Sequence, residues 1–157
     1  MRTAIDVLRD ATGKVSTTFG KDILFHHGET ESVVNYITKL QKANKKAYPA
    51  VIMFTEGKFE IMRRYYLEFT IPKVAICTLT KLNATDDQRL ESNFQEIIYP
   101  IFESLTAELK KLHYGYDFEP PRLDCLYNNK MDKFNQLVDG CFFKITNMKV
   151  IYQHCKR

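Results

Sequence analysis

The residues best suited to chemistry are two adjacent histidines, His26 and His27, which are followed closely by Glu29 and Glu31. Imidazole and carboxylate groups are common metal ligands, so this cluster is a candidate metal site. The local pattern argues against it, because the histidines fall in an expected short strand and adjacent strand residues point to opposite faces. We therefore predict no metal ligand here and interpret both histidines as structural or surface residues.

Nucleophilic chemistry has no better support in the sequence. The four cysteines form no CxxC motif, and reduced thiols in a cytosolic setting are their simplest interpretation; they are Cys77, Cys125, Cys141 and Cys155. No glycine-rich phosphate loop, GxSxG or HExxH motif is present. We predict no enzyme, no catalytic residue and no cofactor. An enzyme that uses a histidine or a cysteine is the third hypothesis, after the two binding functions described below.

Basic residues provide two candidate binding surfaces. Lys58, Arg63 and Arg64 belong to a predicted hairpin over residues 55–64, where they either bind an acidic surface or form a solvated tip. A second group crowds the end of a predicted helix, where cations suit the helix dipole or form a phosphate-binding patch; it consists of Lys39, Lys42, Lys45 and Lys46. The formal net charge of +4 does not by itself require nucleic acid or a membrane as partner.

A long amphipathic helix, expected from Thr85 to Leu112, is the largest element available to position these groups. Its apolar residues recur at steps of three and four, which places them in one stripe. Thr85 and Gln88 form a capping-box pattern at its start. Pro100 removes the hydrogen bond to the Glu96 carbonyl and should kink or split the helix.

The other elements predict an α+β domain with two layers. Shorter helices are expected over residues 3–12 and 30–44, and strands over 50–54, 65–70, 73–81 and 141–152. The proline of Ile71-Pro72 marks an edge or a bulge between two of these strands. Short connections favour an antiparallel or mixed sheet of about four strands, with the helices packed on one face.

The length of 157 residues indicates a single domain over residues 1–157. We expect its core in residues 20–112 and in the C-terminal strand 141–152. Residues 113–140 are rich in aromatic residues and prolines and are interpreted as a long loop region. The longest apolar runs are far too short to span a bilayer, so no membrane is expected as partner.

Three segments of this chain resemble small virion proteins of tailed bacteriophages. They are Tyr48-Pro49-Ala50-Val51-Ile52-Met53-Phe54, Ile71-Pro72-Lys73-Val74-Ala75-Ile76-Cys77-Thr78 and Asn93-Phe94-Gln95-Glu96-Ile97-Ile98-Tyr99-Pro100-Ile101-Phe102. More narrowly, the order of elements is similar to head–tail joining, neck and tail-terminator (tail-completion) proteins of phages and prophages of the Bacteroides group. The resemblance covers residues 20–112 and the final strand, and no catalytic motif contributes to it.

This resemblance implies a structural virion protein, assembled in the host bacterial cytoplasm, that forms a ring of six or twelve copies. Such a ring terminates the tail tube or joins it to the neck, next to tail-tube, connector or portal-associated proteins. DNA passes through its lumen without specific binding.

The expected intersubunit or partner contacts lie in the hairpin and in the aromatic loop at residues 114–121: Lys58, Phe59, Arg63, Arg64, Tyr114, Tyr116 and Phe118. Of these, Lys58, Arg63 and Arg64 are also expected to face the lumen. The alternative is a small cytosolic binding or regulatory protein that contacts nucleic acid through the cluster from Lys39 to Lys46. A salt-dependent affinity for DNA would favour this alternative.

Overall fold

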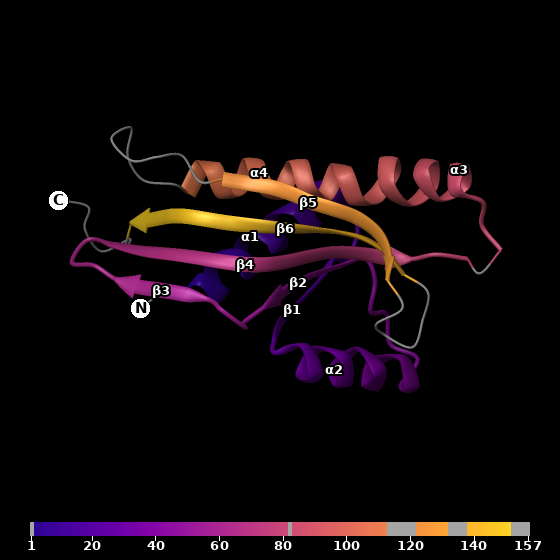
Figure 1. The fold of residues 1–157 in the computed structure, drawn as a ribbon, viewed down its shortest axis with the longest axis horizontal. Coiled ribbons are helices and arrows are strands. Elements are labelled where there is room, and N and C mark those ends of the chain that lie inside the picture. The colour runs from indigo at the N-terminus through magenta and orange to yellow at the C-terminus, as the bar shows by residue number, and fades with distance from the viewer. Residues whose placement is uncertain (1, 82, 113–121, 132–137, 152–157) are drawn as a thin grey trace.

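The computed structural model describes residues 2–81, 83–112, 122–131 and 138–151, with the backbone alone for residues 122–131 (Figure 1). Its helices and a mixed sheet confirm the predicted α+β class. In chain order the elements are α1 (Ala4–Phe19), β1 (Leu24–Gly28), α2 (Thr30–Lys42), β2 (Ala50–Phe54), β3 (Phe59–Met62), β4 (Tyr66–Leu79), α3 (Asp86–Arg89), η1 (Leu90–Ile98), α4 (Tyr99–Leu112), β5 (Arg122–Met131) and β6 (Val138–Ile151).

The sheet has six strands, in the order β1-β2-β4-β6-β5. Strand β3 pairs with the first half of β4, on the edge that β2 occupies further along β4. Strands β1 and β2 are parallel, and the other pairs are antiparallel. The expectation of about four strands was too low because β3 and β5 were missed. Strand β3 has only four residues, and β5 is rich in polar residues, so their pairing depends on partner backbones more than on local pattern.

Strand β5 also corrects the prediction of a loop over residues 113–140. Residues 122–131 pair antiparallel with β6 along their whole length, apart from one irregularity in register. Residues 113–121 and 132–137 lie outside the described residues. The predicted contacts Tyr114, Tyr116 and Phe118 therefore lie outside them too.

Strand β4 is continuous, although two strands were predicted at its position. Its pairing with β6 shifts register between Phe69 and Ile71 and again between Ile71 and Val74. Pro72, which has no N–H for a ladder, lies within this irregular stretch, as expected for a proline at a bulge. The irregularity separates two halves of β4: residues 67–70 pair with β3, and residues 74–77 pair with β2.

The long predicted helix is present, but it is divided into three segments with different hydrogen bonding. Thr85 caps it as predicted: its side chain accepts from the Gln88 N–H, and Gln88 bonds back to the cap. Segment η1 is π-helical, and the Tyr99 N–H that follows it donates to the Phe94 carbonyl, five residues back. The wider turn lies just before Pro100, which cannot donate to the Glu96 carbonyl.

Helices cover both faces of the sheet, which corrects the prediction that they pack on one face (Figure 1). Helices α1 and α4, with η1, cover one face, and α2 covers part of the other. The cause lies in β2, whose five residues are all buried. Because strand side chains alternate, Val51 and Met53 join the α1 core while Ala50, Ile52 and Phe54 join the α2 core.

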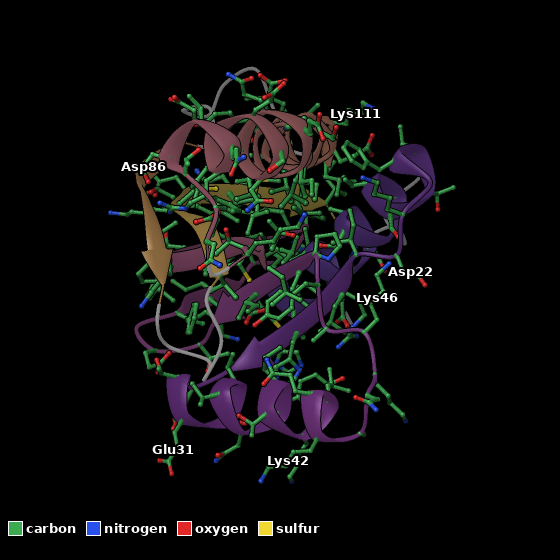
Figure 2. All side chains as sticks on the ribbon, turned by 90° about the vertical axis from the view of Figure 1, so that its right-hand side faces the viewer. Asp22, Glu31, Lys42, Lys46, Asp86 and Lys111 are labelled. Carbon is green, nitrogen blue, oxygen red and sulfur yellow. The ribbon has the colours of Figure 1, made fainter. Side chains whose placement is uncertain are left out.

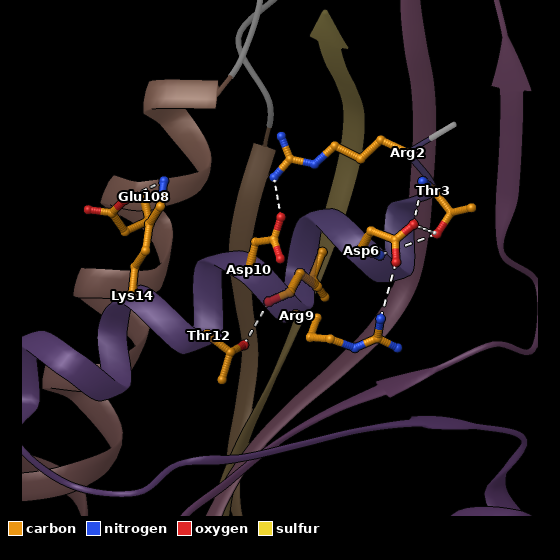
Figure 3. Close-up of polar contacts among 9 residues, drawn as sticks. Arg2, Thr3, Asp6, Arg9, Asp10, Thr12, Lys14 and Glu108 are labelled. Carbon is orange, nitrogen blue, oxygen red and sulfur yellow. Dashed lines mark hydrogen bonds and ion pairs between the residues drawn. The ribbon is translucent and has the colours of Figure 1, made fainter. Parts of the chain in front are cut away.

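Helix α1 extends the core beyond the predicted span of residues 20–112. Its residues Val7, Leu8 and Val15 are buried against the sheet and α4. The helix does not end at Gly13, as predicted, but continues to Gly20, where φ of 63° allows the left-handed stop. Figure 3 shows its polar side, with hydrogen bonds between Thr3 and Asp6 at the start and Lys14 reaching Glu108 of α4 at 3.9 Å.

Candidate interaction surfaces

The hairpin formed by β3 and the start of β4 carries large apolar side chains into solvent. Phe59, Met62 and Tyr65 are each about half exposed, and among the described residues they are half of the large hydrophobic side chains that are exposed. Burying the exposed half of each would contribute roughly 1 kcal/mol, so their exposure is unfavourable in an isolated chain. The hairpin is therefore the first candidate for a contact surface, and Phe59 was among the predicted contacts.

The hairpin also has a free backbone edge. Strand β3 pairs with β4 on one side, and no described strand pairs with its other side. An open strand edge presents backbone donors and acceptors to another chain. The hairpin is nevertheless attached to the body of the protein, because the Ala4 N–H at the start of α1 donates to Glu60 Oε1 at 2.9 Å.

The three basic residues predicted in this hairpin have different environments. Lys58 is largely buried, and its Nζ lies 2.6 Å from Glu60 Oε2, so its charge is already compensated. Arg63 is about half exposed and makes only a long ion pair, 3.7 Å, with Glu68. Arg64 lies over the ring of Tyr65 at 5.1 Å. The positive surface of the hairpin therefore consists of Arg63 and Arg64, and Lys58 is excluded from it.

A second surface lies at the opposite end of the long axis, where β4 leads into α3 (Figure 1). A groove of 610 Å³ lies between the end of β4 and the helix, and its apolar lining includes Leu79, Ala84 and Ile97. Leu79 at its rim is 48% exposed, and nearby Leu90 is 45% exposed. The groove has no signature in the sequence, because its lining residues come from separate elements that meet only in the fold.

Acidic residues lie on the helix side of this groove, and one of them, Glu91, lines it. Asp86 is almost fully exposed at the start of α3, as Figure 2 shows, and Asp87 and Glu91 are exposed on the following turns. Lys81, which lines the groove, is the opposing cation. In the first turn of α3, Asp86 and Asp87 also suit the positive end of the helix dipole. Their position beside exposed leucines gives them a second possible role in binding a basic partner.

Beneath the acidic rim, a buried polar network joins the helix to β6. Asp139 is fully buried, and its Oδ1 accepts from Arg89 Nε at 3.0 Å and from Arg89 Nη2 at 2.6 Å. Its Oδ2 accepts from Asn93 Nδ2 at 2.6 Å. The hydrogen bond to Asp139 raises the pKa of Arg89 further, so its charge is retained. This network stabilises the floor of the groove.

The two histidines lie on opposite faces of β1, in agreement with the argument from strand alternation. His26 pairs in register with Ile52 and stacks on Tyr36 of α2, with ring centroids 3.8 Å apart. Burial, followed by the nearby His27, lowers the pKa of His26. Burial also lowers the pKa of His27, with Arg9 and Lys58 contributing. Across the described ranges, no group of three histidine, cysteine or acidic residues is arranged to hold a metal.

The cysteines whose side chains the structure describes, Cys77 and Cys141, are buried and form no disulfide. Burial raises the pKa of Cys77 to about 12, which keeps the thiol protonated and unreactive at neutral pH. Their environment is therefore that of core residues.

The lysine cluster at the end of α2 is exposed. Lys39, Lys42, Lys45 and Lys46 all lie at the surface. In Figure 2, however, Lys42 lies on the outer rim of α2, whereas Lys46 lies beyond the end of the helix, nearer the sheet. The cluster thus presents several separate cations and no single phosphate cradle.

Comparison of the chain with protein-family models, curated proteins and solved structures found no match. Within the part of the chain that is described, no helix combines the length and apolarity needed to cross a membrane. The function must therefore be argued from the two surfaces themselves.

Proposed function

We propose that this chain is a structural virion protein of the phage head–tail interface, which forms a ring that terminates the tail tube or joins it to the neck. One observation carries the proposal: a hairpin with an open strand edge exposes Phe59, Met62 and Tyr65 at one end of the sheet. A protein whose role is adhesive needs such a surface, since apolar area removed from water on association drives assembly. The resemblance described above supplies the setting in which this surface would act.

The proposed mechanism is steric and adhesive. Hairpin contacts close six or twelve copies around an axis, one ring face binds the last tube ring, and the other docks connector or portal-associated proteins. Repeated contacts between different surfaces of the same subunit generate such rings. DNA passes through the lumen without specific binding, and Arg63 and Arg64 are the hairpin cations available to line it.

Negative-stain imaging and native mass spectrometry of the full chain at the highest attainable concentration test this proposal. Closed rings of six or twelve copies are the expected result, and the copy number separates a terminator from a connector. A strict monomer that also binds DNA would contradict the proposal and favour the alternative.

The alternative function is nucleic-acid binding by a small cytosolic protein, supported by the exposure of Lys39, Lys42, Lys45 and Lys46. Replacing all four by Gln should then weaken DNA binding and flatten its salt dependence, because each phosphate contact contributes to the slope. A matched control replaces four exposed lysines elsewhere by Gln, at Lys21, Lys81, Lys110 and Lys144. Equal DNA affinity of the two variants would exclude this cluster as the binding surface.

A further inference from the structure

We propose that the groove at the end of β4 and α3 receives the β3–β4 hairpin of a second copy of this chain, in a head-to-tail contact. The inference rests on the proposed function, because it supplies the receiving surface that the proposed ring requires. It goes further in naming both sides of the contact. The hairpin side consists of Phe59, Met62, Tyr65, Arg63 and Arg64, and the groove side of Leu79, Leu90, Asp86, Asp87 and Glu91.

The arrangement of the two surfaces favours a head-to-tail contact. The hairpin lies at one end of the long axis and the groove at the other (Figure 1). Neither can therefore contact the other within one chain, but each is accessible to a neighbouring copy. A contact between two different surfaces leaves a free hairpin and a free groove at the ends of every dimer. Addition continues until a ring closes or a filament grows.

The apolar parts of the two surfaces are complementary in kind. Leu79, which is nearly half exposed, supplies the apolar lining of the groove together with Ala84 and Ile97. Leu90, also nearly half exposed, does not line the groove but precedes Glu91, which does. The hairpin supplies two aromatic side chains and Met62, and aromatic anchors in a partner pocket dominate the energy of many interfaces. Together the two ends account for five of the six large exposed hydrophobics of the described residues; the sixth, Ile151, pairs in register with Tyr66 of the same hairpin's strand.

The charges of the two surfaces are also complementary. Arg63 and Arg64 are exposed on the hairpin, whereas Asp86, Asp87 and Glu91 are exposed beside the groove. Three opposing groups reduce the charge difference between the two surfaces. Glu68 already contacts Arg63 at 3.7 Å, and Lys81 lines the groove. The third is Arg89, whose Nη1 lies 2.8 Å from Asp86 Oδ1. Asp87 and Glu91 are therefore the main acids of the groove side.

The groove is built to keep its shape when a partner enters. Its helix side is fixed by the buried Asp139, which accepts from Arg89 and from Asn93. Arg89 is shared between the buried Asp139 and the exposed Asp86, so it compensates Asp86 and leaves Asp87 and Glu91 as the uncompensated acids. The exposed acids therefore set the sign of the surface that an arriving hairpin meets, which favours association of the correct ends.

A reciprocal charge exchange tests the contact. Variant one carries Arg63→Glu and Arg64→Glu; variant two carries Asp87→Lys and Glu91→Lys. Each alone should weaken self-association, measured by sedimentation velocity at about 50 mM salt, by roughly tenfold or more. An equimolar mixture should recover association, because each hairpin then meets a groove of opposite sign. Matched controls are Lys39→Glu with Lys42→Glu, and Glu96→Lys with Glu103→Lys, which change the net charge equally at other exposed positions.

A third variant, Tyr65→Ala, tests the apolar component of the contact between hairpin and groove. It should weaken self-association by about tenfold. Circular dichroism of every variant establishes that each remains folded.

The outcomes separate this inference from the proposed function. Rings that persist unchanged in both charge variants would overturn the contact and leave the proposed function standing. Charge-rescued association into open chains, with no closed ring, would support the contact and count against the proposed function. A wild-type chain that stays monomeric throughout would overturn the contact, and DNA binding by that monomer would contradict the proposed function as well. Loss of association in the control variants as well as in variants one and two would overturn the contact, since a general charge effect would explain it.

Discussion

The two halves of strand β4 show how the same sheet face is used in two ways. In one half, Ala75 and Cys77 point toward α2 and are completely buried. In the other half, Tyr66, Glu68 and Thr70 lie on the same face but are only partly buried, because α2 does not extend over them. The residue types follow this difference: small or apolar side chains under the helix, mixed polar and aromatic ones beyond it.

The comparison suggests that one half of β4 serves folding and the other half serves binding. The covered half needs close packing, so changes there should alter stability. The open half has spare surface and a free edge in β3, so changes there should alter association with little effect on stability. The predictions below test that separation, starting with the largest expected effect.

The largest loss of stability is expected at the covered end, from Arg89→Ala. The substitution leaves Asp139, which is fully buried, without its ionic partner. Breaking a buried pair in this way costs about 3–5 kcal/mol. Urea denaturation should show this decrease in the free energy of unfolding. A decrease below about 1 kcal/mol would mean that the carboxyl group is hydrated or protonated at little cost.

A slightly smaller loss is expected from Ile52→Ala in β2. Ile52 is fully buried between the sheet and α2, next to Val33 and Ile37. Removing its side chain should lower the free energy of unfolding by about 2–5 kcal/mol through lost burial and the remaining cavity. The Ile52→Val variant, which keeps most of the volume, serves as the control and should lose about 0.5–1.5 kcal/mol.

Acidification should lower the free energy of unfolding, because His26 packs against α2 on the covered side of the sheet. Its pKa is lowered in the folded chain, so between its usual value of 6.5 and the lower folded value the unfolded chain binds more protons. Stability should therefore fall as the pH decreases from about 7.5 to about 5.5. The urea midpoint of His26→Phe, which retains an aromatic ring against Tyr36, should show a smaller pH dependence than that of the wild type.

His27 contributes in the same direction, so His27→Gln is the companion variant in this measurement. If neither substitution changed the pH dependence, the decrease in stability would have to come from other groups.

The smallest effect on stability is expected from Phe59→Ser in the open half. Its side chain is about half exposed, so the free energy of unfolding should decrease by no more than about 1 kcal/mol, roughly the contribution of its buried half. Association measured by sedimentation velocity should nevertheless weaken, which would place Phe59 in a contact between chains. A large loss of stability would show that the hairpin depends on Phe59 and that the two halves of β4 are not separable.

Much of the local structure could be predicted because its signals are local. The bounds of β2 follow from five consecutive apolar residues after Pro49, and the helix start follows from the Thr85–Gln88 capping box. The apolar stripe of the long helix became its buried face at Phe94, Ile98, Ile101, Leu105 and Leu109. Each of these features depends on residues only a few positions apart, so the sequence by itself determined it.

Other features were decided only by the tertiary structure. Strands β3 and β5 have weak patterns of their own and exist through pairing with β4 and β6. Strand β2 is apolar on both sides, so each face of the sheet needs a covering helix. The pattern of β2 does not specify which helix covers which face, and the tertiary structure places α2 on the second one.

The candidate surfaces divide in the same way. Lys58, Phe59, Arg63 and Arg64 were predicted as contacts from one short segment, and this stays a prediction; the ion pair of Lys58 with Glu60 was not visible in the sequence pattern. The groove with Leu79 and the acids of α3 could not be anticipated, because it forms where separate segments meet. Local spacing determined which side chains share a face of an element, and long-range packing decided which of those faces remained exposed.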